Sequence, residues 1–173
     1  AIISAEDKNF NTHFGLSVSA LIFRVVNDVV HRRSAGASTL TMQLARNLFA
    51  DEVGFQMGDR SPERKIREIL VAIQIEKRYT KREILTFYAN QMLFGHGTYG
   101  VEAAARLYFN KHAKDVTLGE AAMLAGIIQS PARQSPFVRM AAATNRRNYV
   151  LQQMADNGYI TQEEADATKK QPI

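Results

Sequence analysis

Two segments of the sequence carry carboxylates in surroundings that could support acid–base chemistry, and the first lies close to the start of the chain. Glu6 and Asp7 are followed by the aromatic residues Phe10 and Phe14, and also by His13 and Gly15. A loop that presents one of these carboxylates could use it as a general base or a general acid. The alternative is a solvated, frayed segment without a chemical role. The residue types alone leave both interpretations open.

The second carboxylate is Glu68, which follows Arg64 and Lys65 in a segment with helical periodicity. The i, i+3, i+4, i+7 rule predicts a core face on this helix, formed by Ile66, Ile69, Leu70 and Ile73. One turn after Glu68 the opposite face also becomes apolar, so we expect Glu68 near the start of a part buried on both sides. One interpretation is an active-site carboxylate held by Arg64 and Lys65. The other is an i, i+4 ion pair on a helix surface, worth about 0.3 kcal/mol.

A third segment, Gly36 to Asn47, places hydroxyl side chains at the start of a predicted helix. Ser38 or Thr39 would cap this helix, and its free backbone amides could also hold a phosphate oxygen. Gln43 and Arg46 are three residues apart, so they lie side by side on a helix and could extend such an anion site. Capping alone is the simpler explanation of the hydroxyls.

Most of the chain shows helical periodicity and little of it shows the alternation of a strand, which predicts an all-α fold. The predicted helices include one ending at residues 31–33, one from residue 38 or 39 to about Phe49, one from Ser61 to Arg78, and one over Val138–Asn157 closed by Gly158. Capping boxes predict further helix starts at Thr80/Glu83, Thr117/Glu120 and Thr161/Glu164. Residues 50–59 and 129–137 are expected to be loops.

The composition bounds the chemistry that this chain can perform. Its 173 residues, 46% hydrophobic and 23% charged, are typical of one folded globular domain. Cysteine is absent, which excludes disulfides, thiolate metal sites and a cysteine nucleophile. The four histidines are far apart in the sequence and none belongs to an His-Glu-x-x-His motif. Carboxylates, hydroxyls and basic residues must therefore carry any reaction.

Positive charge is concentrated in one stretch of the sequence. Residues 60–82 hold eight Lys or Arg against three Glu, which equals the formal net charge of +5 of the whole chain. Such a stretch suits an anionic partner: nucleic acid, a phospholipid surface or a phosphorylated substrate. No apolar run reaches the length of a membrane-spanning helix. The chain starts with Ala1 rather than Met, as expected of a domain excised from a longer protein whose leader lies upstream.

Taken in order, these segments resemble the five motifs of the peptidoglycan glycosyltransferases, the family 51 domain of class A penicillin-binding proteins and monofunctional transglycosylases. The matching segments are Glu6-Asp7-x-x-Phe10-x-x-His13-x-Gly15, Gly36-Ala37-Ser38-Thr39-x-x-x-Gln43-Leu44-x-Arg46-Asn47, Arg64-Lys65-x-x-Glu68, Lys81-x-x-Ile84-Leu85-x-x-Tyr88-x-Asn90 and Arg146-Arg147-x-x-Val150-Leu151. Each motif is weak by itself, but five in the family order cover essentially the whole chain.

The resemblance implies a single glycosyltransferase domain over residues 1–173, with a lysozyme-like helical lobe and a small membrane-proximal jaw lobe that includes about residues 48–63. It implies that the domain polymerises lipid II into β-1,4-linked glycan with inversion at the anomeric carbon. Glu6 would be the general base, and Glu68 would position or balance the surrounding cations. Substrate contacts are implied for Asp7, Ser38, Gln43, Arg46, Arg60, Arg64, Lys65, Asn90 and Arg146. The four Arg and Lys residues between positions 46 and 65 would stabilise the leaving pyrophosphate.

The resemblance also implies the partners of the domain. These are lipid II, the growing glycan-lipid pyrophosphate and the outer face of the bacterial cytoplasmic membrane, and nucleic acid is not among them. An anchoring helix is expected upstream of the chain, and a covalently linked transpeptidase domain is possible beyond Ile173. No cofactor is obligatory, although a divalent cation, Mg or Mn, at Glu68 is compatible with the resemblance. The alternatives are a lysozyme-like hydrolase or lytic transglycosylase, which does not need the Arg/Lys cluster, and a basic module that only binds nucleic acid or lipid.

Overall fold

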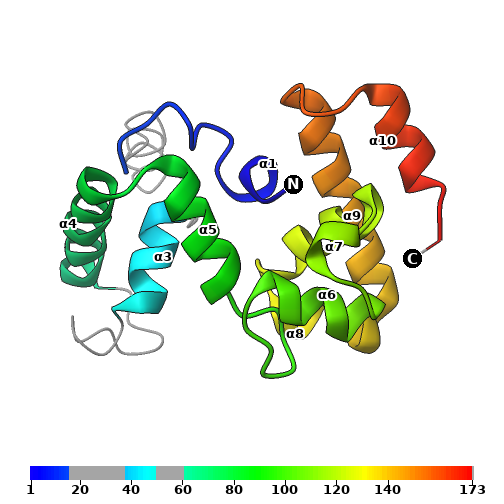
Figure 1. Cartoon of the computed structure of the whole chain (residues 1–173), viewed down its shortest axis with the longest axis horizontal. Coiled ribbons are helices and arrows are strands. Elements are labelled where there is room, and N and C mark those ends of the chain that lie inside the picture. The colour runs from blue at the N-terminus through cyan, green and yellow to red at the C-terminus, as the bar shows by residue number, and fades with distance from the viewer. Residues whose placement is uncertain (16–37, 50–60, 173) are drawn as a thin grey trace. The chain divides into compact units, whose positions relative to one another are not determined.

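The computed structural model describes residues 1–15, 38–49 and 61–172, and the regular structure in these ranges is helical (Figure 1). Within the same ranges, strand-like pairing is limited to an isolated bridge between Leu93 and Tyr99. The predicted all-α fold is therefore confirmed. The expected helix before residues 31–33 and the expected loop at 50–59 lie outside the described residues. Among the helices that are described, none combines the length and the apolar character needed to cross a membrane.

The chain divides into two compact units. Residues 9–88 form one, called the continuous unit below, and residues 1–8 together with 89–173 form the other, called the split unit. The jaw lobe expected near residues 48–63 falls largely on residues 50–60, outside the described part of the chain, and stays a prediction.

The continuous unit contains α3 (Leu40–Leu48), α4 (Pro62–Arg78) and most of α5 (Lys81–Gln91). Helix α3 begins at its predicted cap, since the Thr39 hydroxyl accepts a hydrogen bond of 3.2 Å from the Met42 amide. Helix α4 also begins as predicted: the Ser61 hydroxyl accepts from the Arg64 amide, and a proline occupies the first turn. Helices α3 and α4 pack against each other.

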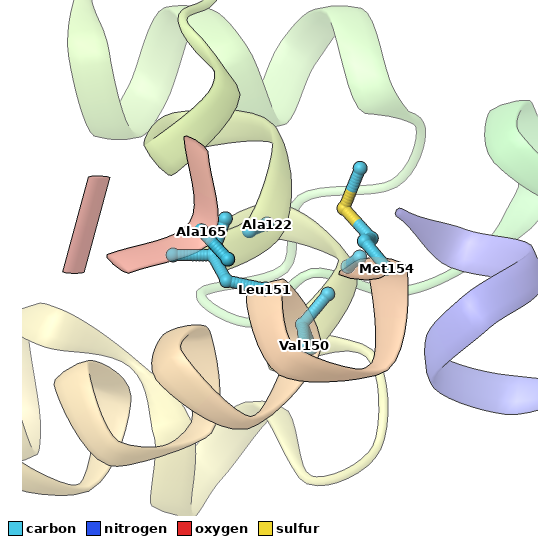
Figure 2. Packing of buried hydrophobic residues seen from close by; sticks show 6 residues of the cluster. Ala122, Val150, Leu151, Met154 and Ala165 are labelled. Carbon is cyan, nitrogen blue, oxygen red and sulfur yellow. The ribbon is translucent and has the colours of Figure 1, made fainter. Parts of the chain in front are cut away.

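The split unit contains α1 (Ile2–Glu6), α6 (Val101–Phe109), a 3-10 turn (Ala113–Asp115), α7 (Leu118–Ile127), α8 (Pro131–Gln134), α9 (Pro136–Asp156) and α10 (Gln162–Lys169). Its core is formed by Ala122 and Ala125 of α7, Val150, Leu151 and Met154 of α9, and Ala165 of α10 (Figure 2). Both α7 and α10 start at their predicted capping boxes. Helix α1 is short, and its residues Ile2 and Ala5 pack against this core.

The predicted loop over residues 129–137 is wrong in part, because the prolines start helices instead of breaking one. Pro131 and Pro136 occupy the first turns of α8 and α9, directly after Ser130 and Ser135. Proline suits this position because its missing amide proton would have no helical partner there. The predicted end of α9 is right within one residue, since the helix ends at Asp156 and Gly158 follows with a φ of +73°.

The predicted core face of α4 is wrong at two positions, whereas the burial expected on the opposite face near Glu68 is confirmed. Ile66 and Leu70 are each 57% exposed, whereas the fully buried positions are Glu68 and Ala72, followed by Ile75 and Glu76. The periodicity rule ranks residues by hydrophobicity, so it chose the isoleucine and leucine stripe and rejected a face with two glutamates. The carboxylates can be buried because cations and a hydroxyl from other segments contact them.

Candidate active site

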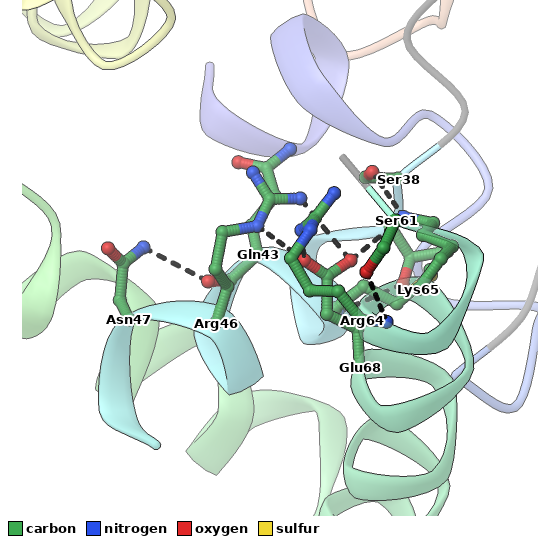
Figure 3. Close-up of polar contacts among 10 residues, drawn as sticks. Ser38, Gln43, Arg46, Asn47, Ser61, Arg64, Lys65 and Glu68 are labelled. Carbon is green, nitrogen blue, oxygen red and sulfur yellow. Dashed lines mark hydrogen bonds and ion pairs between the residues drawn. The ribbon is translucent and has the colours of Figure 1, made fainter. Parts of the chain in front are cut away.

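Three basic side chains surround Glu68 in the continuous unit (Figure 3). Arg46, from the last turn of α3, approaches Glu68 with 2.6 Å between its Nε and Oε1. Lys65, one turn before Glu68 on α4, places its Nζ 3.0 Å from Oε2. Arg64 contacts Oε1 through Nη1 from the adjacent position of the same turn. Among the described residues, the cluster thus holds one carboxylate and three cations, which gives it a surplus of positive charge.

Burial and charge act in opposite directions on Glu68, whose side chain is 0% exposed. Burial alone would raise the pKa of its carboxyl group, because it penalises the charged form. Hydrogen bonds from Arg46 and Lys65, together with the charges of these residues, outweigh burial and hold the pKa below its ordinary value. Glu68 is thus an anion at neutral pH, and the surface ion pair considered from the sequence does not describe it.

The cations differ in their access to solvent. The Arg46 side chain is 42% exposed, whereas those of Arg64 and Lys65 are 15% and 16% exposed. Lys65 also donates a hydrogen bond of 2.8 Å to the Ser38 hydroxyl, at the residue before the cap of α3 (Figure 3). This places Ser38, Arg46, Arg64 and Lys65 in one cluster, as expected of groups that bind an anion together. Arg46 is the member best placed to meet a ligand from solvent.

Gln43 lies one turn before Arg46 on α3 and is held from α5. The fully buried Tyr88 donates a hydrogen bond of 2.8 Å from its hydroxyl to Gln43 Oε1. The Gln43 backbone carbonyl accepts a hydrogen bond from Asn47 one turn later. Sequence analysis assigned no role to Tyr88. Its i, i+4 spacing from Ile84 indicates a core position, but no local signal reveals a partner 45 residues away.

The split unit presents the other carboxylate. Glu6 ends α1 and its side chain is 10% exposed. Arg146, from α9, places Nη2 3.3 Å from Glu6 Oε1 and lies over the Tyr149 ring at 4.7 Å. Gly126 of α7 leaves room for Arg146, because a Cβ there would lie 2.8 Å from Arg146 Cγ. Two elements of the split unit therefore fix the guanidinium that contacts Glu6.

Three further residues, Asp7, Asn90 and Arg60, are also predicted to belong to the site. Asp7 is the C-terminal cap of α1 and is partly buried, and Asn90 is exposed near the end of α5. Arg60 lies outside the described residues. The structure thus brings five predicted residues into one cluster, Ser38, Arg46, Arg64, Lys65 and Glu68, with Gln43 one turn away. It places Glu6 with Arg146 in a second cluster.

The residues around Glu68 do not fit a divalent cation. Both carboxylate oxygens already accept from basic side chains, and three cations beside them would repel a metal ion. In the described ranges no group of three His, Cys, Asp or Glu side chains could hold a metal. The chemistry of this cluster suits an anionic ligand instead.

Comparisons with known proteins identify the family of this chain. The family model described as Transglycosylase matches residues 1–155, so the chain belongs to the transglycosylase family. It is 42% identical to penicillin-binding protein 1A of Aquifex aeolicus over 174 residues, which cover 100% of this chain and 23% of the relative. Penicillin-binding protein 2D of Bacillus subtilis is 39% identical, with coverage of 100% and 24%.

A solved structure gives the same family. The crystal structure of penicillin-binding protein 1A from Haemophilus influenzae matches with a TM-score of 0.52 and 29% identity, over 82% of this chain and 17% of that one. The all-helical fold is thus the transglycosylase fold. The chain spans about a quarter or less of the length of these relatives.

Proposed function

We propose that this domain is a peptidoglycan glycosyltransferase that polymerises lipid II. The observation that carries the proposal is the buried Glu68 with Arg46, Arg64 and Lys65 around it. A pyrophosphate leaving group gains negative charge as its bond to the sugar breaks, and fixed cations stabilise that charge where it develops. A hydrolase that cleaves a glycosidic bond releases a sugar hydroxyl and has no use for such a cluster. Membership in the transglycosylase family favours the same choice.

In the proposed reaction, Glu6 takes the proton of the 4-hydroxyl of the acceptor lipid II. The hydroxyl oxygen attacks the anomeric carbon of the growing chain, and the bond from that carbon to the lipid pyrophosphate breaks. Attack opposite the leaving group inverts an α-linked pyrophosphate to a β-1,4 glycosidic bond. Arg46, Arg64 and Lys65 stabilise the negative charge of the departing pyrophosphate. Arg146 holds the Glu6 carboxylate in a fixed orientation.

In this proposal Glu68 is the counter-charge that keeps three cations close together. Without a carboxylate between them, their mutual repulsion would spread the side chains. Ser38 and Gln43 would contact the donor, Arg60 would help to stabilise the pyrophosphate, and Asp7 and Asn90 would contact other parts of the substrates. We also propose that the domain acts at the outer face of the bacterial cytoplasmic membrane as part of a longer chain with an anchor and a transpeptidase domain. The names and lengths of the relatives support this context.

The experiment is incubation of the domain with labelled lipid II in detergent, with the products separated by size and then treated with lysozyme. We expect lysozyme-sensitive polymer from the wild type. Glu6→Gln should reduce its formation at least a hundredfold, because the amide cannot accept the hydroxyl proton. Glu163→Gln, at an exposed carboxylate of α10, is the matched control and should keep the wild-type rate. A folded Glu6→Gln variant with wild-type polymerisation would falsify the assignment of the base.

A further inference from the structure

A second buried carboxylate on α4 takes no part in the chemistry proposed above. The side chain of Glu76 is 3% exposed. Its Oε1 accepts a hydrogen bond of 2.6 Å from the Thr41 hydroxyl of α3 and one of 2.7 Å from the Lys81 ammonium at the start of α5. Thr41 is itself fully buried. An ion pair at this position is costly to desolvate, and apolar side chains of the same volume would often stabilise the fold as well.

The segment that follows Asp7 in the sequence also contacts the residues around this carboxylate. Phe10 is 1% exposed, and the Lys81 ammonium lies 4.5 Å from the centre of its ring. Gly15, with a φ of +72°, packs so closely that a Cβ would lie 3.2 Å from Glu76 Cγ. The Gly15 carbonyl accepts a hydrogen bond of 2.9 Å from the Thr39 hydroxyl, the cap of α3. Segment 9–15 and helices α3, α4 and α5 therefore meet around Glu76.

Helices α3 and α4 are cross-linked at two places by these contacts. Thr41 bonds to Glu76, and Arg46, five residues further along α3, bonds to Glu68, eight residues earlier on α4. The two helices therefore run in opposite directions here, and the two links lie about 12 Å apart along α4 at 1.5 Å per residue. A shift of α3 by one residue would break the Thr41 bond and displace Arg46 from Glu68. The Thr41–Glu76 bond thus fixes α3 against α4 in the same register that the Arg46–Glu68 contact requires.

We propose that Glu76, with Thr41 and Lys81, is a positioning group for the transfer reaction. It sets the register of α3 on α4, and with it the place of Arg46 in the cation cluster, and it anchors segment 9–15. A buried, hydrogen-bonded charge pair fixes the atoms that it joins, so it adds a directional constraint to the packing of the helices. The effect on the rate rests on the proposed function, while the anchoring itself does not.

The mildest test is Thr41→Val, which removes one hydroxyl and keeps the volume. At a temperature where circular dichroism shows a fully folded chain, we expect kcat for lipid II to fall about tenfold, with KM within twofold of the wild type, because misplacement of a stabilising group slows the chemical step. The double variant with Arg46→Lys should be no slower than Arg46→Lys alone, since in this proposal Thr41→Val acts on the rate through the placement of Arg46. A wild-type kcat, or effects that multiply in the double variant, would overturn the proposal.

Lys81 provides a matched pair of variants. Lys81→Met should lower kcat at least tenfold, Lys81→Arg should restore most of it, and Lys77→Met, at an exposed lysine of the same charge, should leave it unchanged. A loss as large for Lys77→Met as for Lys81→Met would refute a specific role of Lys81.

Hydrogen exchange separates this inference from the proposed function. In Thr41→Val we expect the amides of residues 9–15 and of α3 to exchange about tenfold faster, and those of α7 to stay unchanged. If the wild type makes no polymer, the proposed function fails and the exchange still decides whether Glu76 anchors these segments. Unchanged exchange in both segments would overturn the anchoring whatever the activity.

Discussion

Replacing Glu68 by Gln tests the electrostatic account of the cation cluster. The amide keeps the shape of the carboxylate but removes the negative charge that Arg64 and Lys65, only 15% and 16% exposed, both contact. Removing one partner of a buried ion pair costs about 3 to 5 kcal/mol. We expect a value at the lower end, about 3 kcal/mol at pH 7, because the 42% exposed Arg46 can recover water.

The sign of the pH dependence follows from the lowered pKa of Glu68. The folded state holds the deprotonated form more strongly than the unfolded chain, whose carboxyl titrates near 4.5. The stabilisation is therefore present in full above about pH 5 and is lost as the pH falls through the pKa of the folded state. The difference in the free energy of unfolding between the wild type and Glu68→Gln should become steadily smaller below pH 4.5.

Urea unfolding followed by circular dichroism at several pH values measures this difference, since the chain has no tryptophan for fluorescence. Glu63→Gln, at an exposed carboxylate of the same helix, is the control and should change the free energy of unfolding by about 0.5 kcal/mol or less. A cost below about 1 kcal/mol for Glu68→Gln at pH 7, or an equal cost at pH 3 and pH 7, would refute the reasoning.

Two further substitutions probe the split unit. Gly126→Ala would put a Cβ 2.8 Å from Arg146 Cγ, so Arg146 must move relative to Glu6. The polymerisation rate should fall about tenfold or more while the chain stays folded, and a wild-type rate would show that the Arg146 contact is dispensable. Arg147→Met removes the buried guanidinium that donates to the Lys169 and Gln171 carbonyls. It should cost about 2 kcal/mol and speed hydrogen exchange after α10, and unchanged exchange there would contradict this role.

Helix starts could be predicted well from the sequence because their signals are local. Ser61 and Thr39 cap α4 and α3, and each of the boxes at Thr80, Thr117 and Thr161 forms its reciprocal bonds within four residues. The same holds for the cluster of Arg64, Lys65 and Glu68, whose spacing on one helix brings the charges together.

Features that depend on distant partners could be predicted only in part in this way. The burial of Glu68 and Glu76 on α4 needs Arg46 and Thr41 from α3 and Lys81 from α5. Periodicity scores such glutamates as surface residues, so it placed Ile66 and Leu70 in the core, and only the apolar residues one turn after Glu68 indicated that this face is buried. The helix start at Pro136 was predicted as a loop, because a proline can either end a helix or begin one and its residue type alone does not distinguish the two.

The division of the chain into units has a consequence for its synthesis on the ribosome. Residues 9–88 are contiguous, so the continuous unit can fold as soon as it has emerged. Helix α1 emerges earlier still, but it packs on α7 and α9, and the partner of Glu6 lies 140 residues later. At about 5 to 20 residues per second, α1 must wait roughly 7 to 28 s for that partner. Glu6 is thus synthesised long before the residue that contacts it, so a chain truncated before Arg146 would contain the residues of the cation cluster but not the Glu6–Arg146 contact.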